Sequence, residues 1–475
     1  MRGVWGETLS ARDGYAVGRS FATVVRRAGG SCVAVGRDGR ISSPALEQAV
    51  VQGLCDGGIA VRRIGLCPTP LMYYAVASAE QVHGGIEITG SHNPKDHNGF
   101  KMDLGGQPFF GQDIVELGRI AATGDWMGPA AADFTGVGSV CQVDLVDVDL
   151  VDVDLADVDL AEVDLAKAYI ARILKALDGI DRAAIARMRI GWDTGNGAAG
   201  PLVERLVGHL PGTHVLFHTA VDGHFPHHHP DPSIPENLRD LIGAVAAGKI
   251  DFGFAFDGDG DRLGLVDGRG RIVWGDQILL ILAQDLLKRR PGARIMADVK
   301  TSQVVFDAIT ALGGTPLMAP TGHSLIKSGM KRTGALLAGE MTGHLFFADD
   351  FYGHDDALYG ALRVLAASVR LGASITALRD AMPETHATPE LRFAVPGRDP
   401  RAVVDAVLGQ LCSEGVAFDA TDGARVTLPY GWWLLRVSNT ETVLTARVES
   451  LTAAGLSRSR ADLAARLGKA GVVWA

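Results

Sequence analysis

The sequence predicts an α/β protein with three similar α/β domains of mixed, mainly parallel sheets and a C-terminal α+β domain. Strand-like and helix-like stretches alternate through three successive regions, which is typical of mainly parallel sheets covered by helices. Beyond residue 385, apolar strands are instead grouped with two helices. The 475 residues also fit three or four domains of roughly 100–150 residues each. We expect domains at 1–142, 168–271, 272–385 and 386–475, with a separate segment at 143–167.

Composition narrows the class of protein. The chain is 47% hydrophobic and 21% charged, which is ordinary for a globular protein with several cores. A net charge of −10 argues against nucleic-acid binding but leaves room for an anionic small molecule in a locally positive cleft. The five cysteines form no CxxC pair, which indicates reduced thiols in a cytoplasmic protein. We expect no membrane span, since no apolar run approaches ~20 residues, and the N-terminus shows no signal-peptide hydrophobic region.

The first region should open with a helix that Ser10 caps. Strands are expected at 32–35 and 85–88, and a second helix should begin at Ser43, where a proline follows at the first turn. This alternation of strand and helix is the pattern that predicts a mainly parallel sheet for the region.

The loop TGSHNP at 89–94 follows the strand at 85–88. Its Ser91 lies close in sequence to Lys95 and Lys101, and two cations near one hydroxyl suit an oxygen that carries or receives a phosphoryl group. A motif of this kind taken alone is more often an ordinary turn, so the motifs further along the chain decide its interpretation.

Residues 143–167 form a tandem repeat of five residues, VDLVD-VDLVD-VDLAD-VDLAE-VDLAK. A period of five matches neither a helix nor a strand. The spacing resembles pentapeptide-repeat solenoids, but five copies make little more than one coil, which has no neighbour to stack on. A calcium loop is disfavoured because its glycines and ligand spacing are missing. The favoured interpretation is an acidic interdomain insertion from local duplication.

The second region begins with an expected strand at 189–193 that runs into GNGAAG at 195–200 and a helix. This matches the GxGxxG pattern of dinucleotide-binding proteins, but the next strand ends at His218 where an acidic residue is expected. A tight strand-to-helix turn is therefore the favoured interpretation. The histidine-rich loop 222–232 lacks a definite ligand spacing, so we expect a structured loop there and not a metal site.

A strand expected at 251–256 ends in the sequence DGDGDR. Its three carboxylates can converge on one hard cation, because the intervening glycines let the backbone curl tightly. An EF-hand is excluded, since Arg262 takes its glycine position and Gly268 the position of its final glutamate. Mg²⁺ normally takes a phosphate oxygen as well, so the motif predicts a phosphoryl group nearby, with Ser91 as the candidate carrier. The predicted ligands are Asp257, Asp259 and Asp261.

The third region carries polar clusters at the ends of predicted strands, where open α/β sheets place their ligand sites. One follows the strand at 294–299, and two are expected in strand-to-helix loops at 321–324 and 339–344. The donors and acceptors of the last loop suit sugar hydroxyls. The candidates are Lys300, His323, Glu340, Thr342 and His344.

In the C-terminal region, strands expected at 432–435 and 443–448 flank the sequence RVSNTET. A guanidinium group, hydroxyls and free backbone N–H groups within one turn suit a phosphate monoester. Helices are expected around 401–414 and 458–469. The candidate phosphate contacts are Arg436, Ser438, Asn439 and Thr440.

Four motifs in this order, TGSHNP with Lys101, DGDGDR, GEMTGH and RVSNTE, resemble those of the α-D-phosphohexomutases, most of all the bacterial phosphomannomutase/phosphoglucomutase branch. The similarity covers nearly the whole chain, including DGHFPHHHPDP, DVK and TGHSLIK. It implies four domains around a central cleft. It also implies an isomerase that interconverts hexose 1- and 6-phosphates through a phosphoserine and a hexose 1,6-bisphosphate, with Mg²⁺ as cofactor and glucose 1,6-bisphosphate as activator.

The resemblance also implies a role for each candidate residue. Ser91 would be the phosphoserine and would bind Mg²⁺ together with the three aspartates. Lys101 or His344 would be the proton-transfer group. The further active-site positions implied are Arg2, Arg262 and His92, and those for the sugar and its non-reacting phosphate are Lys300, His323, Glu340, Thr342, His344, Arg436, Ser438, Asn439 and Thr440.

The chain departs from the family pattern in three places. It begins just before Arg2, where the family usually has a leading strand, which leaves the position of Arg2 open. Thr342 replaces the usual serine, and the acidic repeat has no counterpart. The alternatives are a phosphoglucosamine mutase, which Met341 disfavours, a catalytically impaired sugar-phosphate-binding paralogue, and a scaffold that binds a partner through the repeat.

The expected partners are small sugar phosphates, and the expected assembly is a monomer or weak homo-oligomer. The sequence predicts no preference between mannose and glucose phosphates as substrates, because both hexoses offer Glu340 the same 3- and 4-hydroxyls.

Overall fold

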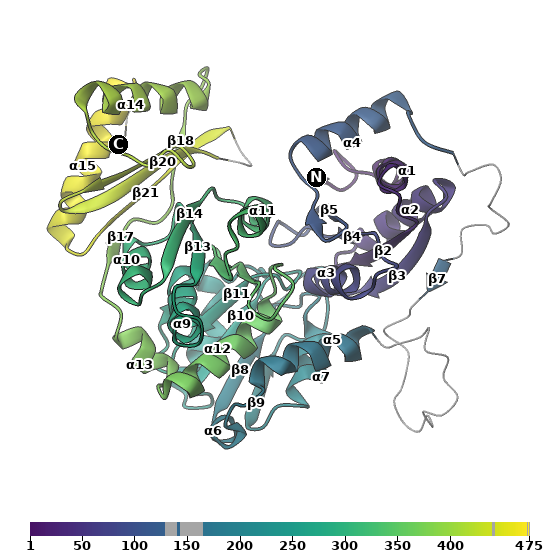
Figure 1. Cartoon of the computed structure of the whole chain (residues 1–475), viewed down its shortest axis with the longest axis horizontal. Helices are drawn as coiled ribbons and strands as arrows, with labels where there is room; N and C mark the ends of the chain where they lie inside the picture. Colours follow the sequence, from purple (N-terminus) through teal and green to yellow (C-terminus); the bar gives the residue numbers. More distant parts are fainter. Residues whose placement is uncertain (129–139, 143–164, 439–441, 473, 475) are drawn as a thin grey trace.

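The computed structural model describes residues 1–128, 140–142, 165–438, 442–472 and 474. Four sheets of seven, five, four and five strands follow one another along the chain. Figure 1 shows the corresponding units in sequence order, from the N-terminal unit in purple to the C-terminal unit in yellow on the opposite side. This is the predicted fold class. The acidic repeat lies outside the described residues except for 165–167, which open helix α5 (Leu165–Leu174).

The first unit is a mixed sheet with helices on both faces. Its elements are β1 (Arg2–Val4), α1 (Ala11–Arg27), β2 (Cys32–Arg37), α2 (Ser43–Asp56), β3 (Ala60–Leu66), α3 (Thr69–Ser78), β4 (Gly84–Ile88), β5 (His97–Leu104), β6 (Gln107–Pro108), α4 (Gln112–Thr123) and β7 (Val140–Gln142). The strand order is β1-β5-β4-β2-β3-β7, with β4, β2, β3 and β7 parallel. Alternate residues of β2 enter different cores: Val33 and Val35 pack with α1 and α2, and Ala34 packs with α3.

Helix α1 begins as its sequence predicts, after Ser10. The backbone N–H and the hydroxyl of Ser10 both donate to the carboxylate of Asp13, at 2.8 and 2.6 Å. Short strand β1 pairs with β5 at the edge of the sheet, which places Arg2 opposite Gly99.

The second unit has the strand order β12-β11-β10-β8-β9, with β10, β8 and β9 parallel. Its elements after α5 are η2 (Lys175–Leu177), α6 (Arg182–Ala186), β8 (Arg189–Asp193), α7 (Gly200–Val207), β9 (Thr213–Phe217), η3 (Pro235–Leu238), α8 (Arg239–Ala246), β10 (Phe252–Phe256), β11 (Leu263–Val266) and β12 (Ile272–Val273). The GxGxxG sequence forms the tight turn between β8 and α7, as expected.

The third unit repeats this design with the strand order β14-β13-β15-β16. Its elements are α9 (Gly275–Arg289), β13 (Arg294–Asp298), α10 (Gln303–Ala311), β14 (Thr315–Ala319), α11 (His323–Thr333), β15 (Leu337–Gly339), β16 (Leu345–Phe347), α12 (Ala357–Leu371) and α13 (Ile375–Asp380). One continuous core joins the first three units, since it includes Leu71 of α3, Trp192 of β8 and Leu358 of α12. The three units are therefore packed against one another.

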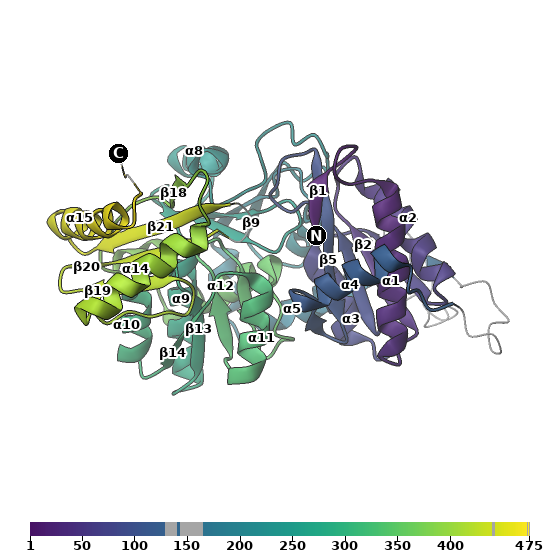
Figure 2. The same cartoon turned by 90° about the horizontal axis from the view of Figure 1, so that it is seen from above.

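The C-terminal unit is an antiparallel sheet whose helices pack into a core of its own. Its elements are β17 (His386–Ala387), β18 (Leu391–Ala394), α14 (Pro400–Glu414), β19 (Ala424–Leu428), β20 (Gly431–Val437), β21 (Val443–Ser450) and α15 (Ala453–Lys469). Figure 2 shows α14 and α15 against this sheet. On the other face, Trp432 and Leu434 meet Val299 of the third unit.

The candidate motifs share one local setting. Each lies in the loop between two antiparallel strands: β4 and β5, β10 and β11, β15 and β16, and β20 and β21. The expectation of a strand-to-helix loop at 339–344 was therefore wrong. The segment after it, Leu345–Phe347, is a short buried apolar run, and periodicity alone cannot tell such a run in a strand from one in a helix.

In the described part of the chain, no helix combines the length and apolar character that a bilayer crossing requires.

Candidate active site

Ser91 is buried in the loop that follows β4, and its side chain contacts the second unit. Its hydroxyl donates to Oδ2 of Asp257 at 2.9 Å and lies 3.2 Å from Nδ1 of His92. Only 1% of Ser91 is exposed, and its φ of 51° is in the left-handed region. Such backbone conformations in non-glycine residues persist where surrounding contacts hold them, and they gather at functional sites. Here the hydroxyl of Thr89 accepts the Ser91 N–H at 2.7 Å.

The three predicted metal ligands form one buried cluster. Asp257, Asp259 and Asp261 each offer an oxygen, and these oxygens lie within 4.8 Å of one another. Burial, with the charges of Asp261 and Asp259, holds the pKa of the Asp257 carboxyl well above its usual range. Among the described residues, Oδ1 of Asp259 and Oδ1 of Asp261 have no hydrogen-bond partner. Buried carboxylate oxygens without partners fit a hard divalent cation such as Mg²⁺.

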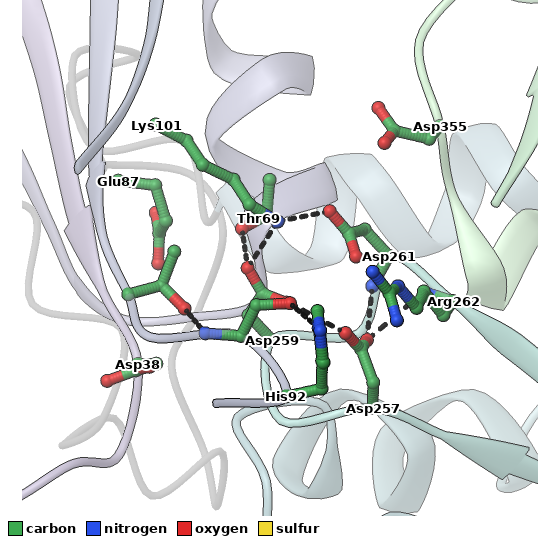
Figure 3. Close-up of polar contacts among 12 residues, drawn as sticks. Asp38, Thr69, Glu87, His92, Lys101, Asp257, Asp259, Asp261, Arg262 and Asp355 are labelled. Atoms are coloured by element: carbon green, nitrogen blue, oxygen red, sulfur yellow. Dashed lines mark hydrogen bonds and ion pairs between the residues drawn. The ribbon is translucent and has the colours of Figure 1, made fainter. Parts of the chain in front are cut away.

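Lys101 of β5 points into this cluster, as Figure 3 shows. Its Nζ lies 2.7 Å from Oδ2 of Asp259 and also bonds Oδ2 of Asp261. Burial by itself lowers the pKa of the Lys101 ammonium, but the two carboxylates outweigh burial and the pKa is raised. Thr69 donates its hydroxyl to the same Asp259 oxygen at 2.6 Å. The cluster is thus partly neutralised by a fixed ammonium group.

A glycine allows the serine loop and the aspartate loop to meet. A Cβ atom on Gly258 would lie 2.5 Å from the carbonyl oxygen of Ser91, which is closer than real Cβ contacts. The N–H of Gly258 donates to the carbonyl of Pro230 at 3.2 Å, so the histidine-rich loop supports the same contact. Residue 258 must therefore lack a side chain for the two loops to approach this closely.

Two residues that the sequence analysis did not select organise the serine loop. The guanidinium of Arg40, fully buried, donates through Nη2 to the carbonyls of Ser91 and Asn93 at 2.6 and 2.7 Å. Asp38 accepts from Nε of Arg40 at 3.1 Å and from the N–H of Gly90 at 3.0 Å. Both follow β2, whose carboxyl end adjoins that of β4. Their place after a central strand is the signal that could have identified them.

His344 belongs to a second buried network. Its Nε2 accepts from Nε of Arg262 at 2.9 Å, and its Nδ1 lies 3.0 Å from Oδ2 of Asp355. Asp355 also pairs with Lys327 at 3.0 Å and with His323 at 3.8 Å. Burial raises the pKa of the Asp355 carboxyl, but Lys327 and the histidines outweigh burial and hold it well below its usual range. The sequence analysis selected neither residue, although Lys327 is the last residue of the TGHSLIK stretch; Asp355 has no motif around it.

Three other predicted residues lie around the serine loop. Arg2 donates to Oδ1 of Asn93 at 3.0 Å, and burial and the charge of Arg262 lower the pKa of its guanidinium. The backbone N–H of Arg262 donates to Oδ1 of Asp257 at 3.1 Å. Burial, followed by the charges of Arg262 and Arg2, lowers the pKa of His92. The region beside Ser91 is therefore rich in positive charge.

The sugar-binding candidates Glu340, Lys300 and Thr342 of the third unit have separate contacts and do not form one network. Glu340 is buried and accepts the N–H of Gly322 at 2.8 Å, and burial raises the pKa of its carboxyl. Lys300 is also buried, with its Nζ 3.7 Å from Glu390. Thr342 is half-buried in the turn between β15 and β16.

Arg436 is the second-last residue of β20 and is 4% exposed. Its Nε donates to Oδ2 of Asp422 at 2.8 Å, and the same oxygen accepts the N–H of Thr321 at 3.1 Å. This carboxylate therefore links the C-terminal unit to the third unit. Nη2 of Arg436 is buried and has no hydrogen-bond partner among the described residues, so the guanidinium retains a donor for an anion.

The turn after Arg436 differs in one respect from its sequence expectation. The N–H of Ser438 is not free, because it donates to the carbonyl of Val443 at 2.9 Å and closes the hairpin. The expected contacts of Asn439 and Thr440 lie outside the described residues.

Comparison with family models covers most of the chain. The phosphoglucomutase/phosphomannomutase alpha/beta/alpha domains I, II and III match residues 1–125, 167–270 and 274–386, and the C-terminal domain of the same family matches residues 390–466. The four matches correspond in order to the four sheets described above.

Individual relatives agree with the family match. The chain is 39% identical over 459 residues to a phosphomannomutase/phosphoglucomutase of Pseudomonas aeruginosa, covering 96% of this chain and 92% of that one. It is 39% identical to a phosphoglucomutase of Neisseria gonorrhoeae, covering 96% and 93%. A crystal structure of a phosphoglucomutase/phosphomannomutase family protein from Burkholderia thailandensis superposes with a TM-score of 0.87 at 37% identity, covering 100% and 98%. The chain therefore belongs to the phosphoglucomutase/phosphomannomutase family of α-D-phosphohexomutases.

Proposed function

We propose that this chain is a phosphomannomutase/phosphoglucomutase that interconverts hexose 1-phosphate and hexose 6-phosphate through a phosphoserine at Ser91. The observation that carries the proposal is the 2.9 Å contact of the Ser91 hydroxyl with Asp257, inside a buried aspartate cluster in which two oxygens have no hydrogen-bond partner in the described part of the chain. The names and sequence similarity of the relatives support the same activity.

Each half-reaction moves one phosphoryl group and one proton. In the first, the phosphoryl group leaves Oγ of Ser91 for O6 of a hexose 1-phosphate, O6–H loses its proton to a base, Oγ takes up a proton to become the serine hydroxyl, and a hexose 1,6-bisphosphate forms. The bisphosphate then turns end over end. In the second, the phosphoryl group on O1 returns to Oγ, whose proton leaves, and O1 takes a proton as hexose 6-phosphate is released. The serine ends phosphorylated, as it began.

The proposed metal ligands are Asp257, Asp259 and Asp261 together with a phosphate oxygen on Ser91. When bound there, Mg²⁺ supplies positive charge to the transferring phosphoryl group. Lys101 adds a fixed positive charge beside the cluster, since its ammonium is held by two carboxylates. The backbone N–H groups of the loop hold Asp257 in orientation.

Proton transfer is better suited to His344 than to Lys101. The raised pKa of Lys101 makes its ammonium a donor and a poor base. His344 receives the N–H of Arg262 at Nε2, and that nitrogen therefore carries a lone pair, while Asp355 faces the other ring nitrogen. The residue can accept a sugar hydroxyl proton at Nε2 once Arg262 turns to the phosphate.

The remaining candidates are proposed to hold the substrate. Glu340 and Thr342 would bind sugar hydroxyls, with Lys300 and His323 beside them, and Arg436 would bind the non-reacting phosphate. The Nη2 of Arg436, buried and without a hydrogen-bond partner among the described residues, supports this role. Ser438, Asn439 and Thr440 are proposed as further phosphate contacts. A monomer or weak homo-oligomer in the cytoplasm remains our prediction.

The test is a coupled assay of mannose, glucose and glucosamine 1-phosphates with Mg²⁺, after priming with glucose 1,6-bisphosphate. We expect turnover of mannose and glucose phosphates, with a fall of about 10⁴-fold or more in Ser91→Ala. Intact mass should detect one phosphoryl group on the wild type and none on this variant, and Ser413→Ala on α14 serves as the control. Faster turnover of glucosamine phosphate would favour the phosphoglucosamine mutase alternative, and binding without turnover would favour the impaired paralogue.

A further inference from the structure

Three residues of the second unit form a cluster that the proposed reaction does not use. Asp193 ends β8, His218 follows β9, and His228 lies in the histidine-rich loop. Each offers one ligand atom, and these atoms lie within 4.8 Å of one another. Asp193 is buried, and the side chains of His218 and His228 are 14% and 13% exposed. The cluster therefore has the composition of a two-histidine, one-carboxylate metal site and partial access to solvent.

The hydrogen bonds of His228 constrain what lies between it and Asp193. Its Nδ1 is 3.0 Å from the carbonyl oxygen of His229, so Nδ1 carries a hydrogen. Its Nε2 is 3.0 and 3.2 Å from the two oxygens of Asp193. A lone pair facing a carboxylate is repelled, so either a proton or a cation must lie at Nε2. Metal-bound histidines usually donate their other ring N–H to a carbonyl or carboxylate in this way.

His218 has the corresponding arrangement. Its Nε2 lies 2.7 Å from Oδ2 of Asp240, which is a carboxylate partner outside the cluster. The ring of His218 stacks on that of His227, with the ring centroids 4.0 Å apart, and packs edge-on against that of His228, with the centroids 5.3 Å apart. Its φ of 54° is unusual for a residue with a side chain. The ring is thus held by contacts on two sides.

We propose that Asp193, His218 and His228 bind a divalent transition metal of the Zn²⁺ or Co²⁺ class. Bonds of roughly 2.0–2.2 Å to nitrogen and oxygen put neighbouring ligand atoms on the order of 3 Å apart, which matches the separation of His228 and Asp193. Mg²⁺ prefers oxygen ligands only, so this site and the aspartate loop select different ions.

The metal holds in place the loop that supports the reacting groups. His229, next to His228, bonds the carbonyl of His92, and the carbonyl of Pro230 accepts the N–H of Gly258. A cation at His228 therefore stabilises the contacts of this loop with both the serine loop and the aspartate loop. It takes no part in the proposed reaction. The sequence spacing pointed away from a metal because two of the three ligands come from other strand ends.

Cobalt provides the test, because its visible spectrum reports nitrogen ligands. Metal-stripped enzyme with excess Mg²⁺ is titrated with Co²⁺ and then with Zn²⁺. We expect the wild type to bind one Co²⁺ that Zn²⁺ displaces, and His218→Phe and His228→Gln to bind it at least about tenfold more weakly. His224→Ala, an exposed histidine of the same loop, and Asp259→Asn in the aspartate loop should bind it as the wild type does.

Thermal unfolding gives a second measurement that does not depend on colour. Zn²⁺ should raise the Tm of the wild type and of His224→Ala, and leave that of His218→Phe unchanged. The Phe ring keeps the stacking on His227, so the folded state of this variant can be checked without metal. Equal Co²⁺ affinity in wild type and His218→Phe, loss of binding only in Asp259→Asn, or no Co²⁺ spectrum in the wild type would each overturn the proposal. His228 and Asp193 would then form a histidine–aspartate ion pair without a metal.

Discussion

The end of the site that contains Ser91 and the end that contains Arg436 are built in different ways. Ser91 and Lys101 from the first unit bond directly to aspartates of the second, and one core runs through the first three units. Arg436 lies in a unit with its own core, and a carboxylate shared with Thr321 connects it to the third unit.

The difference corresponds to the two tasks that the proposed reaction sets. Phosphoryl transfer needs reacting atoms held before substrate arrives, because preorganised charge costs no rearrangement in the transition state. Holding the inert phosphate only requires binding energy, and the bisphosphate must be released and rebound in the opposite orientation. A buried cluster of paired charges suits the first task, and a guanidinium with a donor that no described residue bonds suits the second.

Asp259→Asn should have the largest effect on this contrast. It removes one proposed metal ligand and one of the two carboxylates that hold Lys101. We expect kcat to fall on the order of 10²–10³-fold, as for loss of one preorganised charge, and the Mg²⁺ requirement to rise. Chelation should abolish wild-type activity, and Mg²⁺ should restore it. Asp405→Asn, an exposed position of α14, is the control; an unchanged Mg²⁺ dependence in Asp259→Asn would remove this cluster from the reaction.

Arg436→Gln should act on the other end and mainly on KM. A hydrogen bond to a charged group contributes about 1.5–3 kcal/mol, so we expect kcat/KM to fall roughly 10- to 150-fold, with kcat less affected. Steady-state kinetics of the primed enzyme measure both constants. Arg460→Gln, exposed on α15 of the same unit, should behave as the wild type. A fall in kcat with unchanged KM would contradict the assignment of Arg436 to substrate holding.

Gly258→Ala tests whether the first end depends on close packing of two loops. Its new Cβ meets the Ser91 carbonyl, so the loops must separate. Overpacking costs about 1–3 kcal/mol, and we expect kcat to fall about tenfold with KM nearly unchanged. The matched change is Gly243→Ala in α8, where a Cβ meets open space. Equal kcat in the two variants would show that the loops have room to adjust.

Asp356→Asn should have the smallest effect and concerns stability only. Burial raises the pKa of this carboxyl from 3.8 to about 7 in the folded protein. Between about pH 4 and 7 the folded state keeps a proton that the unfolded state releases, so the free energy of unfolding falls as the pH rises through that window. Asn keeps the acceptor for Tyr359 and Tyr169. Urea unfolding at pH 5 and pH 8 should differ less in the variant than in the wild type; an equal difference in both would contradict the raised pKa.

Particular residues show how far sequence reasoning reaches. The strand at 189–193 has the predicted bounds, and the helix expected at 401–414 is α14, Pro400–Glu414. The edge strands and the antiparallel turn after Glu340 could not be predicted, because short apolar runs such as Leu345–Phe347 have no periodicity that distinguishes a strand from a helix.

The sequence alone determined the family, the fold class and the order of the motifs, since glycines, alternating carboxylates and strand periods are local properties of the chain. Only the tertiary structure decided which side chains from distant parts of the chain contact one another. Arg40 reaches the Ser91 carbonyl across 51 positions, Asp355 faces His344 from another element, and His218 joins Asp193 and His228 from a separate strand end. Contacts of this kind depend on the packing of strands distant in sequence, which no local pattern encodes.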